Sequence, residues 1–160
     1  MNPLAEQFDN RLTGLPVLGV CGLSGAGKTT LIESILVDLA ARGLKTVVVK
    51  HGCRELEVDR RGKDSDRLFA AGADVYLCGG ERFSRLHGPA DDLVLELINL
   101  ADRYDLVLVE GHAGSPLEKI WLLSDGENGE PAAAGISLVL GRSENRRAKC
   151  LSFIDDFLQE

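Results

Sequence analysis

The chain has 160 residues, of which 44% are apolar and 27% are charged, a composition that suits a folded domain with a buried core and excludes a disordered chain. The formal net charge is −7, which disfavours a nucleic-acid partner because nucleic-acid phosphates attract basic surfaces. We expect one domain over residues 1–160, with residues 1–13 as a flexible or peripheral segment.

The first residues lack the basic and apolar pattern of a signal peptide, and no apolar run approaches the roughly 20 residues that cross a bilayer. No two cysteines form a C-x-x-C pair, and two of the cysteines sit in apolar, strand-like runs. The sequence therefore predicts a cytoplasmic location, no membrane contact, and reduced, mostly buried thiols at Cys21, Cys53, Cys78 and Cys150.

The first elements predicted along the chain are a strand, a helix and a second strand. Leu15–Cys21 is almost continuously apolar, as in a strand that is buried on both faces. Thr29–Arg42 has apolar residues at helical spacing and is followed by Gly43, a residue type that favours helix ends. With Thr46–Val49 as the next buried strand, these elements form a βαβ unit, which implies parallel pairing and a right-handed crossover.

Strands and helices continue to alternate along the rest of the chain. This alternation predicts a three-layer α/β fold with a mostly parallel central sheet. In chain order we expect a charged loop at Glu55–Lys63, a helix from Asp64 or Ser65 to Ala71, strands at Val75–Cys78 and Arg82–Leu86, a helix from Pro89 to Asp102, strands at Leu106–Val109 and Lys119–Leu123, a polar turn at Ser124–Pro131, a strand at Ile136–Leu140 and a helix at Glu144–Gln159.

The segment that joins the first strand to the first helix fits the G-x-x-x-x-G-K-[ST] pattern of a P-loop. Its glycines let the backbone wrap a phosphate, and the helix N-terminus adds its positive dipole end. We expect Lys28 to reach the terminal phosphates and the Thr29 hydroxyl to bind Mg²⁺. The alternative is a glycine-rich turn with an exposed lysine. The phosphate-binding residues of this predicted P-loop nucleotide-binding domain are Gly22, Ser24, Gly25, Ala26, Gly27, Lys28, Thr29 and Thr30.

Two carboxylates are candidates for the acid that a P-loop enzyme needs near its metal. Glu110 ends the apolar strand that starts at Leu106, and it would emerge near the phosphates if that strand lies beside Leu15–Cys21. There it would hold Mg²⁺ through water or polarise the attacking water; the alternative is a strand-end carboxylate that caps a turn. Asp59, on the charged loop, is the second candidate.

Further polar groups follow the second strand. Lys50, His51 and Cys53 are expected at the same edge of the sheet as the P-loop, although two ligands are too few for a closed metal site. The segment Gly62–Ser65 and Arg67 combine cations with a helix N-terminus. That combination suits either a second anion or a capped surface helix.

Two basic clusters, Arg60–Arg61–Lys63 and Arg146–Arg147–Lys149, stand out in the acidic chain. Because charged side chains are mostly hydrated surface groups, we expect both clusters to be solvated. His112, which follows Glu110 closely, can titrate near neutral pH, but a lone histidine on a loop more often has no chemical role.

Several of these segments occur together in one known family. They are Lys50-His51, Asp59-x-x-Gly62-Lys63-Asp64-Ser65, Ala71-Gly72-Ala73, Asp105–Gly111 and Lys119-Ile120. In their order and spacing, from about Leu15 to about Leu140, they resemble the MobB family of molybdopterin-guanine dinucleotide biosynthesis proteins.

The resemblance implies a P-loop GTP-binding adaptor with weak GTPase activity that assists the MobA guanylyltransferase in attaching GMP to molybdopterin. It also implies a homodimer joined in part by a β-extension, with GTP and Mg²⁺ as cofactors and molybdopterin as a ligand. Asp59 and Glu110 would lie near the metal or the water, and Lys50, Lys63 and Arg67 would line an anion-binding surface. The chain has no N-K-x-D box, so guanine is implied by the resemblance alone.

Two other functions remain open from the residues. A small-molecule kinase would use Glu110 as its base. Such a kinase also needs a lid that carries arginines over the phosphates, and no arginine-rich segment lies between the last predicted strands. A metal-insertion GTPase would need several metal ligands at close spacing, whereas the histidines are scattered at His51, His87 and His112.

Overall fold

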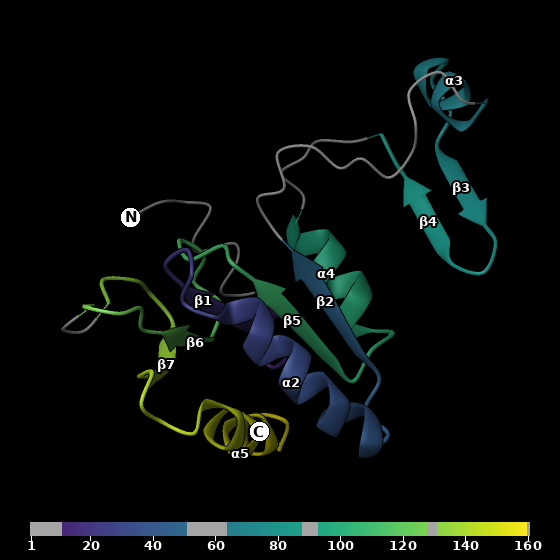
Figure 1. Cartoon of the computed structure of the whole chain (residues 1–160). Helices are drawn as coiled ribbons and strands as arrows, with labels where there is room; N and C mark the ends of the chain where they lie inside the picture. Colours follow the sequence, from purple (N-terminus) through teal and green to yellow (C-terminus); the bar gives the residue numbers. More distant parts are fainter. Residues whose placement is uncertain (1–10, 51–63, 88–92, 128–130, 160) are drawn as a thin grey trace. The chain divides into compact units, whose positions relative to one another are not determined.

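The computed structural model describes residues 11–50, 64–87, 93–127 and 131–159. They belong to two compact units: residues up to 52 together with those from 93 onward form the first, and residues 53–92 form the second (Figure 1). The elements in chain order are β1 (Val17–Gly22), α2 (Lys28–Ala41), β2 (Thr46–Lys50), α3 (Asp64–Ala70), β3 (Val75–Cys78), β4 (Arg82–Arg85), α4 (Leu93–Ala101), β5 (Leu106–Glu110), β6 (Lys119–Leu122), β7 (Ile136–Leu140) and α5 (Arg146–Phe157).

In the first unit, the described strands form a five-stranded sheet in the order β2-β5-β1-β6-β7. All four strand pairs are parallel, which confirms the predicted parallel sheet. β1 and β2 run parallel but do not pair with each other as the βαβ unit implied, because β5 lies between them. Every residue of β5 is buried, whereas β2 is only half-buried, so β5 takes the interior position and β2 the edge.

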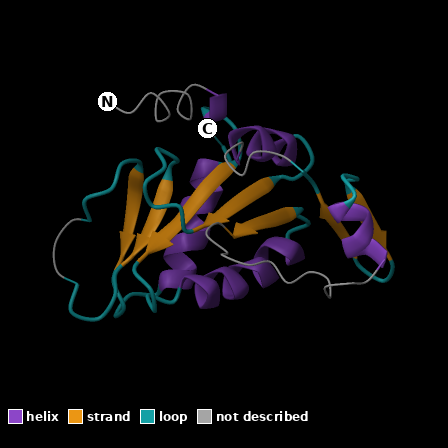
Figure 2. Ribbon diagram, turned by 90° about the horizontal axis from the view of Figure 1, so that it is seen from above, coloured by secondary structure: helices purple, strands orange, loops and turns teal. Residues whose placement is uncertain are grey.

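Helices cover both faces of this sheet (Figure 2). Alternate residues of a strand point to opposite faces, and β1 divides in this way. Leu18 of β1 packs in one core with Ile35 of α2 and Ile154 of α5. Val17 packs in a second core with Leu97 of α4 and with residues of β5. The predicted three-layer α/β fold is therefore confirmed.

The described ends of the elements differ from the expected ones by at most two residues, which is the usual uncertainty of helix and strand ends, and β3 and β7 have the expected bounds. The beginning of the predicted helix from Pro89 lies outside the described residues, and α4 is described from Leu93. In the part of the chain that the structure describes, no helix has both the length and the apolar character to cross a bilayer.

The second unit contains α3 and the antiparallel pair of β3 and β4. Arg85 of β4 forms an ion pair with Asp66 at 2.9 Å, and its guanidinium lies 3.9 Å from the ring centre of Phe69. The Phe69 ring also stacks on His87 at 3.8 Å. Cys78 is exposed on β3, so the expectation of a buried thiol was wrong there; the apolar run belongs to a strand that is covered only on alternate residues.

Candidate functional site

The P-loop follows β1 and opens α2, as the sequence predicts. Gly22, Gly25 and Gly27 all have positive φ angles, of 142°, 78° and 90°. A β-carbon on Gly22 would collide with the carbonyl oxygen of Leu122, so glycine is required there both for φ and for space. Gly27 is the N-cap of α2 and provides no side-chain cap. The first turn of α2 therefore presents backbone N–H groups that can donate hydrogen bonds to an anion.

Lys28 reaches back over the loop from the first turn of α2. Its ammonium group donates to the carbonyl oxygens of Gly22 at 3.0 Å and Leu23 at 2.8 Å. Both acceptors are neutral and only partly shielded from water, so a phosphate oxygen would be a stronger acceptor for the same group. Lys28 is thus held at the loop, where its ammonium group can exchange these carbonyl acceptors for an oxygen of a terminal phosphate.

Glu110 lies next to the P-loop because β5 pairs with β1. Val20 is in register with Glu110, and Lys50 of β2 is in register with Glu110 on the other side. The hydroxyl of Thr29 donates to Oε1 of Glu110 at 2.8 Å, and Nζ of Lys50 lies 3.8 Å from the same oxygen. Glu110 is only 9% exposed. The structure thus brings together the hydroxyl, the carboxylate and the cation that were picked out from the sequence.

A hydroxyl and a carboxylate are the hard oxygen ligands that suit Mg²⁺. Among the described residues, no group of three or more His, Cys, Asp or Glu side chains could hold a metal by itself. This donor set fits Mg²⁺, which usually keeps several waters and takes its remaining ligands from substrate phosphates. Thr29 and Glu110 would hold the ion, which would neutralise charge on the phosphates.

The segment that follows Glu110 is fixed by contacts that the sequence did not reveal. The thiol of Cys21 donates to the carbonyl oxygen of Gly111 at 3.0 Å, and the Gly111 N–H donates to Val20 at 3.0 Å. Lys119 donates through Nζ to the carbonyl oxygens of Ala113, at 3.1 Å, and Ser115. A lysine in β6 therefore anchors the loop that begins directly after Glu110.

Lys119 is fully buried, which is rare for lysine. Its stem lies over Gly19 of β1, where an added β-carbon would be 2.9 Å from the β-carbon of Lys119. Burial lowers the pKa of Lys119 and raises the pKa of the Cys21 thiol. The sequence singled out Lys119 only through the family resemblance; the glycine in the middle of a buried strand was the physical signal for this close approach.

Two arginines near the P-loop were also missed. Arg146, expected to be solvated surface, is half-buried and donates to the carbonyl oxygen of Ala26 at 2.7 Å. Arg142 donates to the carbonyl oxygen of Gly25 at 2.9 Å. The prediction that this basic cluster is solvated was wrong for Arg146. Its acceptor lies 120 residues earlier in the chain, and a sequence pattern does not reveal a hydrogen bond between such distant residues.

Some of the predicted site residues cannot be compared with this geometry. Asp59, Lys63, His51 and Cys53 lie outside the described residues. Arg67 belongs to the second unit, where it lies 3.7 Å from Asp64 and is largely exposed. The roles expected for these residues stay predictions.

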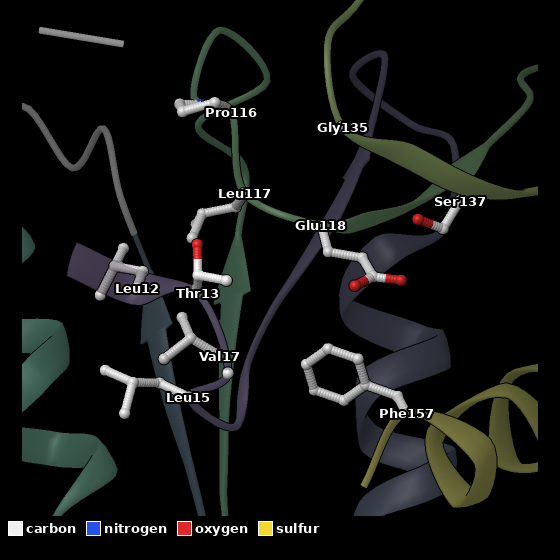
Figure 3. A pocket seen from close by; sticks show the side chains of 11 residues that line it. Leu12, Thr13, Leu15, Val17, Pro116, Leu117, Glu118, Gly135, Ser137 and Phe157 are labelled. Atoms are coloured by element: carbon white, nitrogen blue, oxygen red, sulfur yellow. The ribbon is translucent and has the colours of Figure 1, made fainter. Parts of the chain in front are cut away.

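A separate pocket of about 300 Å³ lies at the amino ends of β1, β6 and β7, the opposite edge of the sheet from the P-loop (Figure 3). Val17, Glu118, Ser137 and Phe157 are among its lining residues. Its described lining residues include a carboxylate and no basic side chain, so this lining does not suit a phosphate.

A family model connects this geometry with known proteins. The model described as "Molybdopterin guanine dinucleotide synthesis protein B", MobB, matches residues 17–139. The chain belongs to the MobB family. The matched segment includes the P-loop, Glu110 and Lys119.

Curated members of the MobB family are similar to the chain over much of its length. The "Molybdopterin-guanine dinucleotide biosynthesis adapter protein" of Haemophilus influenzae is 41% identical over 112 residues, which are 68% of this chain and 63% of the relative. The protein of the same name from Escherichia coli is 36% identical over 125 residues, 74% of this chain and 71% of the relative. The chain thus spans a little under two thirds of the Haemophilus protein.

Solved MobB structures share the fold. The crystal structure of Bacillus subtilis MobB has a TM-score of 0.65 and 27% identity, and the match covers 90% of this chain and 96% of that one. A MobB homologue from Bacillus stearothermophilus has a TM-score of 0.62 at 22% identity, with coverage of 91% and 97%. These structures support the assignment of the chain to the P-loop α/β fold.

Proposed function

We propose that this chain is a GTP-binding adaptor with weak GTPase activity that assists the attachment of GMP to molybdopterin. The observation that carries the proposal is the P-loop with Thr29 donating to Glu110, within a segment that matches the MobB family. The relatives from Haemophilus influenzae and Escherichia coli are named as adapter proteins of molybdopterin-guanine dinucleotide biosynthesis. Guanine is proposed as the base on the family membership alone.

In this proposal the P-loop amides and Lys28 hold the phosphates of GTP, while Thr29 and Glu110 hold Mg²⁺. Asp59 is a second carboxylate for the metal or the attacking water. Lys50, Lys63 and Arg67 provide cations for an anionic ligand such as molybdopterin. The partner is a MobA-like guanylyltransferase, the working form is a homodimer, and the protein acts in the cytoplasm.

Slow hydrolysis agrees with the arrangement of the arginines. Fast P-loop enzymes place an arginine on the phosphates in the transition state. Arg142 and Arg146 instead donate to main-chain carbonyls of the P-loop. We therefore expect a partner to complete the site if hydrolysis is to be fast.

The test is GMP transfer to molybdopterin by a purified guanylyltransferase, with and without this chain. Wild-type chain should increase the rate of transfer, and Lys28→Ala should not, because it cannot hold GTP. Lys45→Ala is the matched control: Lys45 is an exposed lysine that precedes β2 and lies over the ring of Tyr104. If the wild-type chain does not change the rate of transfer at any ratio of the two proteins, the adaptor proposal is wrong.

A further inference from the structure

Two arginines that follow β7, Arg142 and Arg146, donate hydrogen bonds to main-chain carbonyl oxygens of the P-loop. Nη2 of Arg142 donates to the oxygen of Gly25 at 2.9 Å. Nη1 of Arg146 donates to the oxygen of Ala26 at 2.7 Å. These are successive peptide groups of the P-loop, and their donors lie 117 and 120 residues further along the chain. The contacts are therefore tertiary and do not arise from local turn geometry.

Arg146 also connects the P-loop to the ends of two strands. Its Nη2 donates to the oxygens of Leu123 at 2.6 Å and Leu140 at 3.2 Å, and its Nε donates to Gly141 at 3.0 Å. With Ala26, four main-chain oxygens accept from one planar guanidinium. A planar group with five N–H donors can satisfy such a ring of acceptors in fixed directions, which an ammonium group cannot do.

The contact with Ala26 has a direct consequence for phosphate binding. In a trans peptide the C=O and the N–H point in opposite directions, so a donor that fixes the Ala26 carbonyl also fixes the Gly27 N–H. Gly27 is the N-cap of α2, a position where the N–H groups of a helix N-terminus would face a bound anion. A hydrogen bond to a carbonyl also polarises its peptide and strengthens the N–H as a donor.

The glycines of the loop make such fixing necessary. Gly25 and Gly27 both have positive φ, and glycine moves between positive and negative φ at little cost. Within the loop, the Ala26 N–H donates to the carbonyl oxygen of Leu23 at 3.2 Å, which helps to hold the Gly25–Ala26 peptide. The Ala26–Gly27 peptide is instead held by contacts from outside the loop. Arg146 supplies these contacts at the peptide that enters α2, and its Nη1 would be 3.6 Å from a β-carbon on Gly27.

We infer that Arg146, supported by Arg142, is a positioning residue for the phosphate site, holding the P-loop peptides so that the Gly27 N–H points at the anion. This inference rests on the proposed nucleotide binding. Arg146 contacts the loop through main-chain carbonyl oxygens, so its proposed role is to position the loop and not to bind the anion itself. The ends of β6 and β7 are thereby coupled to the P-loop.

The test compares Arg146→Lys with Arg147→Lys. Arg147 is the adjacent residue of α5, and it forms an exposed ion pair with Asp38 of α2 at 2.7 Å. Both substitutions keep the charge and remove the guanidinium fork. Arg146→Lys should weaken the binding of Mg²⁺-GTP and Mg²⁺-GDP at least tenfold and should move the ¹⁵N resonance of Gly27 in the ligand-free protein. Arg147→Lys should change neither quantity.

The inference is overturned if Arg146→Lys folds, binds GTP with wild-type affinity and leaves the Gly27 resonance unmoved. If Arg146→Lys does not fold, Arg142→Gln takes its place, because Arg142 is about half exposed. Arg142→Gln should move the Ala26 resonance and weaken GTP binding at least twofold; wild-type values for both overturn the inference. If the wild-type chain binds no nucleotide, the proposed function fails, while the Gly27 resonance still reports whether Arg146 fixes its peptide.

Discussion

Replacing Glu110 with Gln should make the free protein more stable and make it bind Mg²⁺-GTP less tightly. Gln has nearly the same shape and keeps an oxygen that accepts from Thr29, so the 2.8 Å contact survives without its charge. Changing a charged acceptor to a neutral one loses about 1 kcal/mol. The ion pair with Lys50, whose side chain is 60% exposed, contributes only about 0–1 kcal/mol.

These losses are smaller than the cost of burying the charge. Keeping a carboxylate in a site that is 9% exposed carries a desolvation penalty of several kcal/mol, whereas burying the neutral amide of Gln costs only about 1–3 kcal/mol. We expect a net stabilisation of about 1 kcal/mol, which raises Tm by roughly 2–4 °C in a chain of this size. Binding should change in the opposite direction. Losing a charge-assisted contact to the Mg²⁺ shell costs about 1.5–3 kcal/mol, which weakens Mg²⁺-GTP binding by roughly 10- to 150-fold.

Urea unfolding gives the stability, and calorimetric titration of GTP with and without Mg²⁺ gives the affinity. If Glu110 also polarises the attacking water, as the sequence predicts, hydrolysis should fall by a larger factor than affinity. Glu118→Gln is the control, since it removes the same charge at the opposite edge of the sheet. A Glu110→Gln variant that is less stable than wild type and binds Mg²⁺-GTP normally would refute the reasoning and make Glu110 a structural residue.

Three further outcomes follow from the same geometry. The free energy of unfolding of wild type, relative to Lys119→Met, should increase as the pH rises from the lowered pKa of Lys119 to 10.5, because the unfolded chain binds more protons there. Urea unfolding that gives the same difference between the two proteins at pH 7 and at pH 10.5 would contradict this. Gly22→Ala should destabilise the protein by about 1–3 kcal/mol, whereas Gly114→Ala, which meets nothing within 4 Å, should be close to neutral in the same measurement. Iodoacetamide should label exposed Cys78 and spare Cys150, whose thiol pKa burial raises to about 12; peptide mapping that finds Cys150 labelled in folded protein would count against the core described here.

The sequence predicted the elements of the site better than their surroundings. A P-loop is defined by local spacing, and Glu110 ends a strand whose apolar run marks it as buried, so both could be placed at one edge of the sheet. The lateral order of strands was harder to predict, because periodicity identifies a strand but not its neighbours. The insertion of β5 between β1 and β2 depends on how buried each strand is in the folded sheet.

The residues that the sequence analysis missed act through main-chain acceptors. Arg146 binds carbonyls at the ends of β6 and β7 and in the P-loop, which meet only in the folded chain. Lys119 binds two carbonyls of the loop after Glu110. Every residue type has a main-chain carbonyl, so the sequence does not show which carbonyls accept from a side chain. These cations therefore resembled ordinary surface or strand residues. Gly19 did record the close approach of the Lys119 side chain, because a larger residue would not leave room for it.

Titration of Mg²⁺-GTP into wild type and Lys28→Ala, with circular dichroism of both, tests the central claim most directly. The ammonium of Lys28 now donates to two P-loop carbonyls and would transfer to the terminal phosphates. We predict that wild type binds GTP, and that Lys28→Ala keeps the wild-type spectrum but shows no measurable binding. A folded Lys28→Ala variant with undiminished affinity for GTP would contradict the account.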